Sequence, residues 1–404
     1  MLGAIMAVLP AAEIWRDYVI DGVPSSGPYK PHKAEIREWG THLESAASAY
    51  DTVADVEAET VPTTTNVVRT FGHTAAGDDG DDLYVRADPA PARAAYITDA
   101  VGQHFAITSR TIKTASWGLF PGTANAHLIL KQMIDYLMLD KGGGEIQITH
   151  DEEYEFSSSV TMAAVAAGIL HIFNKAGGTL KAATGLAAPL LDLRPNASGT
   201  ASPEAARLKA YGLKLDNSLG SYTVGASSAT GLSLVNWDQF ELHDFVCVGG
   251  YDPIVGTVPT VGGDSGLSTV GCRNGLLINP RIERQPDSGI YPNWDNTGAS
   301  SGFIEVIGGV LYRNHAAMTA KRNLSSAKLV GVRVSENDAG LQTAWVDNSG
   351  WIEPCKKLEV IGCTFRRGLA NLISAKHTTK LIAIGNVFED VGYKPDGTGN
   401  VGAN

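Results

Sequence analysis

The sequence predicts a mainly β chain whose main part, residues 145–404, is a right-handed parallel β-helix, preceded by a small helical and β N-terminal region. Two observations lead to this fold class. Short apolar frames recur at steps of 23 to 36 residues, and turn clusters such as "NDAG" and "PDGTGN" lie between them. A repeat of this length, rich in strand-forming residues, is typical of a solenoid in which stacked segments share one elongated core.

Each frame has five residues: an apolar residue, usually Gly, a small or apolar residue, any residue, and an apolar residue. Frames begin at seven positions: Tyr211, Leu242, Ile278, Ile307, Val330, Ile361 and Ile384. Because side chains of a strand alternate with a period of two, we expect positions one, three and five to face the core. The last four frames should occupy equivalent strands of successive coils.

The preceding chain is predicted to have three parts. Residues 1–60 would form an attachment segment whose helix places Ile36, Trp39 and Leu43 on one apolar stripe, so that it needs a partner to pack against. Residues 61–122 would form a small connecting β domain. Residues 123–144 would form a helix, from about 126 to 140, that ends at a glycine run and caps the open end of the solenoid.

Composition excludes several classes of function. The 404-residue chain has 32 Lys and Arg against 43 Asp and Glu, a net charge of −11, and no basic block, so we expect no nucleic-acid partner. No apolar run approaches the roughly 18 to 20 residues that span a bilayer, so we expect no membrane insertion. The N-terminal "MLGAIMAVLPAA" lacks the basic start of a signal peptide.

No motif indicates a metal or a cofactor. The histidines lack a spacing such as HExxH, GxSxG is absent, and "KGGGE" is the end of a helix rather than a phosphate loop. We therefore expect no cofactor and no metal site. The four cysteines lack CxxC spacing and are expected to be buried free thiols, with a disulfide between Cys247 and Cys272 as the alternative.

A candidate catalytic pair comes from the residues that follow the frames and should face outward. In that column, Asp216 and Glu283 would lie about 10 Å apart if two coil steps of about 4.8 Å separate them. This is near the separation of about 6.5 to 9.5 Å found in inverting glycosidases. The alternative is that both are ordinary solvated carboxylates.

A candidate carbohydrate site comes from two long insertions that carry exposed rings beside carboxylates. Sugars stack their apolar faces on such rings and hydrogen-bond to polar neighbours. In the alternative, the same rings cover the core or form an intersubunit contact. The candidate residues are Asp287, Tyr291, Trp294, Asp295, Trp345, Asp347 and Trp351.

Three segments resemble known families. "AEIWRDYVIDGVPSSGPYKPHKAEIREWGTHLE" resembles the N-termini of tail fibre and tailspike proteins of phages and prophages of rhizobia-like alphaproteobacteria, and "LYVRADPAPARAAYITDAVGQHFAI" resembles the linker that follows there. "LILKQMIDYLMLDKGGGEIQI" through "EEYEFSSSV" is similar to the entry of pectate-lyase-like β-helices. In place of the Asp-rich "GDGxxDD" stretch of that entry, this chain has "WGLFPGTANAH", which weakens any catalytic inference.

The resemblance implies a virion protein that attaches through its N-terminus to other tail or baseplate proteins. The residues expected to make this attachment are Trp15, Arg16, Tyr18, Ile36, Trp39 and Leu43. It also implies a homotrimer, and apolar residues expected to face outward, Phe245, Val310, Tyr312 and Val387, are consistent with self-association.

Three functions remain open from the sequence. The first is a tail fibre or tailspike component that contacts bacterial surface polysaccharide during host recognition. The second is a depolymerase, hydrolase or lyase, that acts on capsule, exopolysaccharide or lipopolysaccharide. The third is a secreted pectate-lyase-like enzyme, against which the tail-fibre-like N-terminus and the absence of a signal-peptide pattern both count.

Overall fold

The structure is a computed structural model that describes residues 47–196, 204–221, 230–251, 264–294, 302–320, 324–342, 355–368, 372–375 and 378–390. The predicted attachment helix and its residues Trp15, Arg16, Tyr18, Ile36, Trp39 and Leu43 lie outside the described residues. The chain divides into two compact units, Met1–Thr108 and Ser109–Asn404. The four-part division predicted from the sequence stays a prediction.

The described part of the first unit, residues 47–108, contains a five-stranded sheet in the order β1-β2-β3-β5-β4 and the short helix α4. Strand β1 pairs parallel to β2 and the other pairs are antiparallel. Helix α4 (Val53–Ala58) begins at a capping box in which Thr52 and Asp55 each accept a hydrogen bond from the other's backbone N–H. The strands are β1 (Ala47–Tyr50), β2 (Val67–Thr70), β3 (Asp82–Ala87), β4 (Tyr96–Thr98) and β5 (His104–Ile107).

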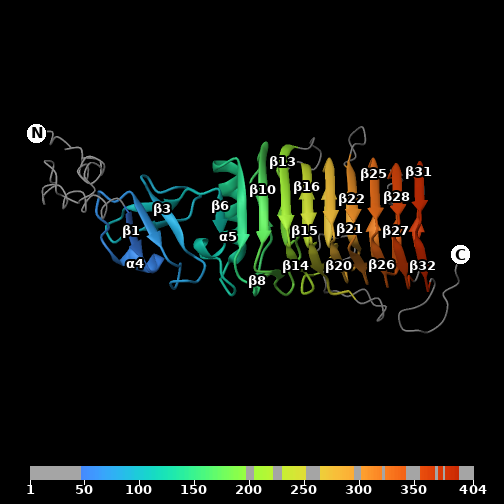
Figure 1. The fold of residues 1–404 in the computed structure, drawn as a ribbon, viewed down its shortest axis with the longest axis horizontal. Helices are drawn as coiled ribbons and strands as arrows, with labels where there is room; N and C mark the ends of the chain where they lie inside the picture. The colour runs from blue at the N-terminus through green and yellow to red at the C-terminus, as the bar shows by residue number, and fades with distance from the viewer. Residues whose placement is uncertain are drawn as a thin grey trace, which may run out of the picture. The chain divides into compact units, whose positions relative to one another are not determined.

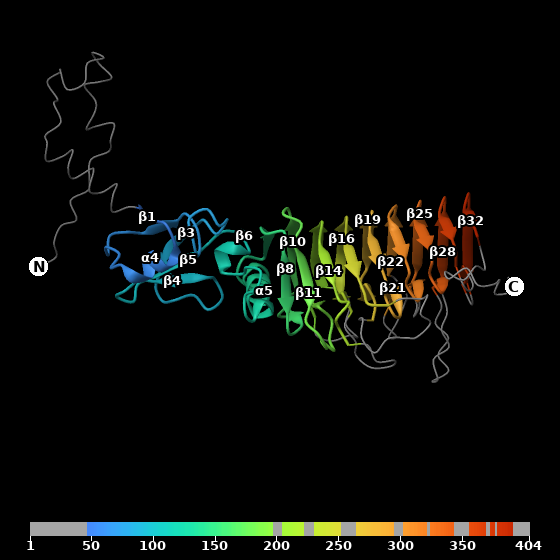
Figure 2. The ribbon, with the colours of Figure 1, turned by 90° about the horizontal axis from the view of Figure 1, so that it is seen from below.

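The second unit is a parallel β-helix, as predicted. In the described part of the chain, three parallel sheets of ten, nine and eight strands run along it. Each of the eight coils from β7 to β30 contributes one strand to each sheet in turn, with β6 before them and β31 and β32 after them. Figure 1 shows these coils following one another in chain order from β10 to β31, and Figure 2 shows the same stack turned by 90°.

The first sheet contains β6 (Thr111–Lys113), β7 (Gly143–Ile148), β10 (Ala167–Asn174), β13 (Glu204–Tyr211), β16 (Trp237–His243), β19 (Asn274–Ile278), β22 (Phe303–Ile307), β25 (Ser326–Val330), β28 (Lys357–Ile361) and β31 (Lys380–Ile384). The second sheet contains β8 (Glu153–Phe156), β11 (Thr179–Ala182), β14 (Lys214–Asp216), β17 (Val246–Val248), β20 (Arg281–Glu283), β23 (Val310–Tyr312), β26 (Arg333–Ser335), β29 (Thr364–Arg366) and β32 (Val387–Glu389). The third sheet contains β9 (Val160–Thr161), β12 (Leu191–Leu193), β15 (Leu232–Val235), β18 (Leu267–Val270), β21 (Ser288–Asn293), β24 (Ala316–Thr319), β27 (Ala339–Gln342) and β30 (Ile373–Ser374).

A helix covers the first coil, where the sequence predicts one. After the short 3-10 helix η1 (Ala115–Trp117), α5 (Ala126–Asp135) continues as the π-helix η2 (Tyr136–Asp140). The chain then turns at Gly142, which has a φ of 68°. Leu130 of α5 lines a small apolar cavity with Ile146 and Tyr154 of the first coil, so the helix shields the end of the core from water.

The last four frames lie in register, as predicted: Ile307 pairs with Val330, Val330 with Ile361, and Ile361 with Ile384. The frame placed at Leu242 is wrong by one residue, because His243 is the partner of both Tyr211 and Ile278.

The prediction that the first frame position faces inward is also wrong. Val332 and Val334, at positions three and five of their frame, are buried, but position one is half-buried or exposed in every described coil. In the last described coil position five is also open, because Phe388 is 50% exposed. The second position turns the corner with positive φ, 63° at Gly331, and this interrupts the strand alternation. The one-residue error at Leu242 also assigned side chains to the wrong face. Phe245, predicted to face outward, is 0% exposed. Val248, not Cys247, lies in the outward column.

All four cysteines are free and buried, as predicted, and no disulfide joins Cys247 to Cys272. Within the described ranges, no helix combines the length and the apolar character that a membrane crossing requires.

Candidate functional site

The corner between the second and third sheets repeats an unusual backbone conformation in five successive coils. The residue after the second-sheet strand has a φ of 49° to 61° each time, at Arg284, Arg313, Glu336, Arg367 and Asp390. For residues other than Gly, this backbone conformation costs roughly 1–2 kcal/mol of conformational free energy. The conformation therefore persists only where surrounding contacts hold it. Long polar side chains are therefore presented side by side at a rigid corner.

A buried polar ladder beneath the corner supplies that rigidity. Asn337 donates to the carbonyl oxygens of Leu311 and Ser335, at 2.9 and 3.1 Å, and accepts from the backbone N–H of Asn314 at 2.7 Å. Asn314 accepts in the same way from the N–H of Gln285 at 3.0 Å. The side chains of Gln285, Asn314 and Asn337 are 0 to 1% exposed. Each rung thus ties its corner to the next coil.

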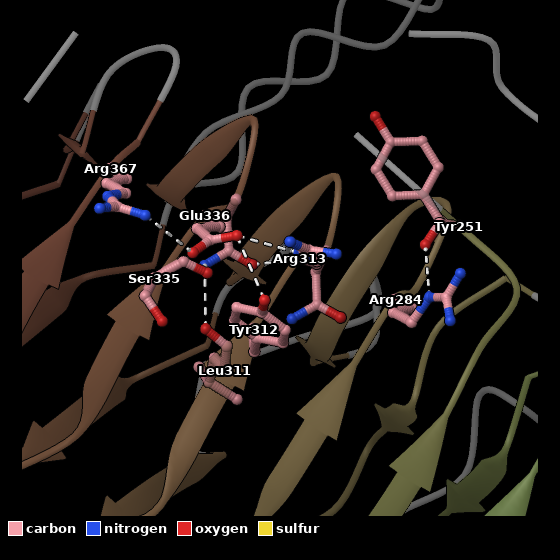
Figure 3. A network of polar contacts seen from close by, with 10 residues as sticks. Tyr251, Arg284, Leu311, Tyr312, Arg313, Ser335, Glu336 and Arg367 are labelled. Carbon is pink, nitrogen blue, oxygen red and sulfur yellow. Dashed lines mark hydrogen bonds and ion pairs between the residues drawn. The ribbon is translucent and has the colours of Figure 1, made fainter. Parts of the chain in front are cut away.

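Above this ladder, Glu336 joins three coils, and Figure 3 shows it at the centre of a polar network. One carboxylate oxygen accepts from the hydroxyl of Tyr312 at 3.2 Å and from Nε of Arg313 at 2.9 Å. The other lies 3.7 Å from a guanidinium nitrogen of Arg367. Burial raises the pKa of Tyr312, and the negative charge of Glu336 raises it further. We call these four residues the Glu336 cluster.

A second cluster, the His315 cluster, lies along the same corner and consists of Tyr251, His315 and Asp338. Nδ1 of His315 lies 3.2 Å from Oδ2 of Asp338, and the hydroxyl of Tyr251 donates to the same oxygen. The rings of Tyr251 and His315 meet edge to face with centroids 6.1 Å apart. Tyr251 follows β17, three coils before the coil of Asp338 in the sequence. Its backbone N–H donates to the carbonyl oxygen of Arg284, so the chain after β17 carries Tyr251 towards the later coils.

The electrostatics of the His315 cluster favour the charged imidazole. The hydrogen bond to Asp338 raises the pKa of His315, burial lowers it, and the negative charges of Asp338 and Asp287 raise it again, with a net upward shift. The side chain of His315 is 49% exposed, so a ligand can reach it. Oδ1 of Asp338 is buried and has no hydrogen-bond partner within the described part of the chain.

Together the two clusters offer two phenols, an imidazole, carboxylates and guanidinium groups at one corner. This mixture suits a saccharide, whose hydroxyl groups need both donors and acceptors in fixed positions. A half-exposed imidazole paired with a carboxylate can also transfer a proton. Among the described residues, no group of three or more His, Cys, Asp or Glu side chains is arranged to hold a metal ion.

The structure places Asp216 and Glu283 in one outward column, as predicted, with Val248 between them. Two coil steps separate them by about 10 Å. Each carboxylate has a local partner: Asp216 accepts from the N–H of Ser218 at 2.8 Å, and Glu283 accepts from Nε of Arg281 at 3.0 Å. Their catalytic role stays a prediction.

Of the predicted carbohydrate-binding residues, Asp287, Tyr291 and Trp294 are described. Asp287 lies at the corner next to the His315 cluster and contributes to its field. Tyr291 is half-buried in β21, and Trp294 is 9% exposed and lies against Gly302. Asp295, Trp345, Asp347 and Trp351 lie outside the described residues. The carbohydrate-binding role of all seven stays a prediction.

Sequence reasoning missed both clusters, although a signal was present. "RNH" at 313–315 and "END" at 336–338 are the same pattern 23 residues apart, a charged residue, Asn, and a polar residue. The middle Asn faces inward in both, which sends its two neighbours outward. No sequence pattern indicated Tyr251, because it follows a strand three coils earlier than the coil of Asp338.

No protein-family model matches the chain, and no curated protein matches its sequence. Solved structures with similar folds include phage tailspike proteins. The tailspike of Acinetobacter phage vB_ApiP_P1 is 12% identical, over 88% of this chain and 74% of that one, with a TM-score of 0.40. The tailspike of Acinetobacter baumannii bacteriophage Fri1, a capsular polysaccharide depolymerase, is 12% identical over 86% and 64%, with a TM-score of 0.44.

The enzymatically active domain of tailspike protein 2 from bacteriophage CBA120 is 11% identical, over 91% of this chain and 57% of that one, with a TM-score of 0.43. The predicted origin in phages of rhizobia-like alphaproteobacteria is not supported by these matches, which come from phages of other bacteria. At these identities the matches show a similarity of fold alone.

Proposed function

We propose that the chain is a tail fibre or tailspike subunit that contacts bacterial surface polysaccharide with the corner carrying the Glu336 and His315 clusters. The observation that carries this proposal is the alignment of the two clusters along successive coils. A polysaccharide is itself a linear repeat, so a row of donors and acceptors along the coils can contact several sugars at once.

The N-terminal resemblance supplies the rest of the proposal. The segment before residue 47 attaches the chain to other tail or baseplate proteins of the virion. Three copies associate with parallel axes, so that three such corners are presented together. Residues 47–58 form β1 and α4 of the first unit, so a truncation meant to remove only the attachment segment should end at residue 46.

Retention on immobilised polysaccharide tests this function. The intact chain is passed over capsule and lipopolysaccharide preparations from a panel of bacteria, together with Arg313→Ala and the matched control Arg207→Ala. Arg207 is 51% exposed on the first sheet, away from the corner. We expect the wild type and the control to be retained by at least one preparation and Arg313→Ala to lose at least tenfold in affinity. Equal retention of both variants would exclude the corner as the contact.

A second candidate function, cleavage of the same polysaccharide, is favoured by the His315–Asp338 pair. A protonated imidazole held by a carboxylate can donate a proton to the leaving sugar oxygen while water attacks the anomeric carbon and gives its proton to a carboxylate. Glu336, two residues before Asp338 at the same corner, carries such a carboxylate. Release of oligosaccharide by the wild type, and a loss of release in His315→Ala that is larger than its loss of retention, would establish cleavage. Binding without any released oligosaccharide would leave attachment as the function.

A further inference from the structure

The outer face of the first sheet carries a continuous apolar column. The last residues of five successive first-sheet strands pair in register from coil to coil: Ile278, Ile307, Val330, Ile361 and Ile384. We call these five residues the apolar strip. Ile307 is 38% exposed and Ile384 is 58% exposed, and the other three are half-buried. In the three preceding coils the same column holds Phe173, Tyr211 and His243, whose rings lie 5.6 and 4.7 Å apart.

The neighbouring column on the same strands is of a different kind. Two residues before the strip, the outward positions of β22, β25 and β28 are Glu305, Lys328 and Glu359. Lys328 and Glu305 form an ion pair at 2.6 Å across the two coils. At the two ends of the strip the same neighbouring column holds Leu276 and Ile382. The apolar strip therefore lies beside charged side chains in its three middle coils.

On the other side of the last four residues of the strip, the corner positions carry no side chain. The corner residues after Ile307, Val330, Ile361 and Ile384 are all glycines, and a Cβ built at any of them would meet nothing within 4 Å. Positive φ alone does not demand glycine, since Asp244 and Asn279 occupy the same corner in earlier coils with φ of 50° and 53°. Bare backbone next to the strip allows another backbone to approach closely.

We propose that the apolar strip and the glycines Gly308, Gly331, Gly362 and Gly385 form an interface with a second copy of this chain, packed parallel and in axial register. An apolar side chain recurs every coil, about 4.8 Å along the axis, and a partner with the same axial repeat fits it at every step. Another copy of the β-helix has that repeat. A saccharide is a poor occupant, because the strip offers no hydrogen-bonding side chain.

Closed symmetry strengthens this choice. When copies are related by a rotation axis parallel to the solenoid, every copy buries the same strip and each residue meets its own counterpart. The inference rests on the self-association proposed above and names its surface. It does not depend on which saccharide the opposite corner binds.

Sedimentation equilibrium of the full chain at micromolar concentration tests the interface. We expect the wild type to have a multiple of the 42.6 kDa chain mass. Ile361→Lys should reduce the mass to that of one chain, because like charges would meet at the interface. The matched control is Ile169→Lys, on the same face of the first sheet but four residues before the column, where the wild-type side chain is 42% exposed. Circular dichroism checks that each variant keeps its β-helix.

Two further variants separate the interface from folding. Gly331→Asn keeps a corner conformation that Asn279 already adopts, so the coil should fold while the added side chain weakens association at least tenfold. Ile361→Cys should form a disulfide between copies on mild oxidation, because parallel packing in register brings residue 361 of each copy together.

The outcomes are distinct. A monomeric wild type would overturn both the self-association and this interface. A wild-type oligomer that survives Ile361→Lys, or one in which Ile361→Cys forms no disulfide, would overturn the interface alone. Dissociation of Ile361→Lys and Gly331→Asn but not of Ile169→Lys, with the disulfide formed, would establish it.

Discussion

Nδ1 of His315 lies 3.2 Å from Oδ2 of Asp338, although the two residues belong to successive coils and are 23 positions apart in the sequence. The ladder of Asn314 and Asn337 holds both corners, so the pair is set by the backbone rather than by flexible side chains. The pKa of His315 therefore reports whether the contact between His315 and Asp338 is formed.

The first prediction concerns the pKa of His315. Asp338→Asn removes the partner that raises this pKa, so we expect the pKa to fall in the variant. The measurement is the rate of modification of His315 by diethyl pyrocarbonate against pH, followed by mass spectrometry, because only the neutral imidazole reacts. Glu359→Gln, on the first sheet, is the control and should leave the profile unchanged. An identical profile for Asp338→Asn would contradict the assigned cause.

The same pair makes a pH-dependent contribution to stability. Because the folded-state pKa of His315 is raised above its ordinary value near 6.5, the contribution is complete below that value and is lost as pH rises through the folded-state pKa. We therefore expect His315→Ala to lower the thermal midpoint more at pH 6 than at pH 8. A larger effect at pH 8 would contradict the sign of the shift.

The third prediction concerns the Glu336 cluster. Glu336→Gln weakens the contacts to Tyr312, Arg313 and Arg367, and we expect a loss of about 1–2 kcal/mol in the free energy of unfolding, measured in urea. Glu153→Gln is the control, because Glu153 pairs with Lys181 at 2.7 Å but is 59% exposed. Such exposed pairs contribute under about 1 kcal/mol. Equal losses of unfolding free energy in the two variants would show that the Glu336 cluster stabilises the fold no more than an exposed ion pair does.

The fourth prediction concerns the polar ladder. Asn337→Ala leaves the buried carbonyl of Leu311 and the N–H of Asn314 without their partner, and we expect a loss of about 2–3 kcal/mol. Asn274→Ala, at an exposed position of β19, should change the free energy of unfolding by under about 0.5 kcal/mol. An unchanged free energy of unfolding in Asn337→Ala would show that water replaces the hydrogen bonds of the Asn337 side chain.

The fifth prediction concerns the thiols. Burial raises the pKa of Cys355 to about 11 and also raises the pKa of Cys247, Cys272 and Cys363. We expect the folded chain to react with less than one equivalent of a thiol-specific disulfide reagent and the denatured chain to react with four. Rapid reaction of the folded chain would contradict the burial of these side chains.

The fold was predictable because its signal repeats. Frames such as those at Ile361 and Ile384 share one pattern in every coil, so their register could be read from spacing alone. The inward face could not be read in this way, because a residue with positive φ at the second frame position interrupts the strand alternation. The frame at Leu242 fails for a different reason: His243 is the true first position, and this shift of one residue wrongly places the buried Phe245 on the outer face.

The site was less predictable, for a physical reason. Asp216 and Glu283 could be placed in one column by counting, because strands stack at a fixed spacing. The contact between Tyr251 and Asp338 joins residues 87 positions apart across several coils, and no local pattern encodes it. Only the repeated segments "RNH" and "END", 23 residues apart, could have indicated the corner from the sequence.

Protection of His315 by polysaccharide is the most direct test of the central claim, that this corner binds the glycan of a bacterial surface. The rate of diethyl pyrocarbonate modification is measured with and without the polysaccharide that retains the wild type, and His171 on the first sheet is the internal control. We predict a reduction of at least fivefold at His315 and no change at His171. Equal rates at His315 with and without polysaccharide would contradict the claim.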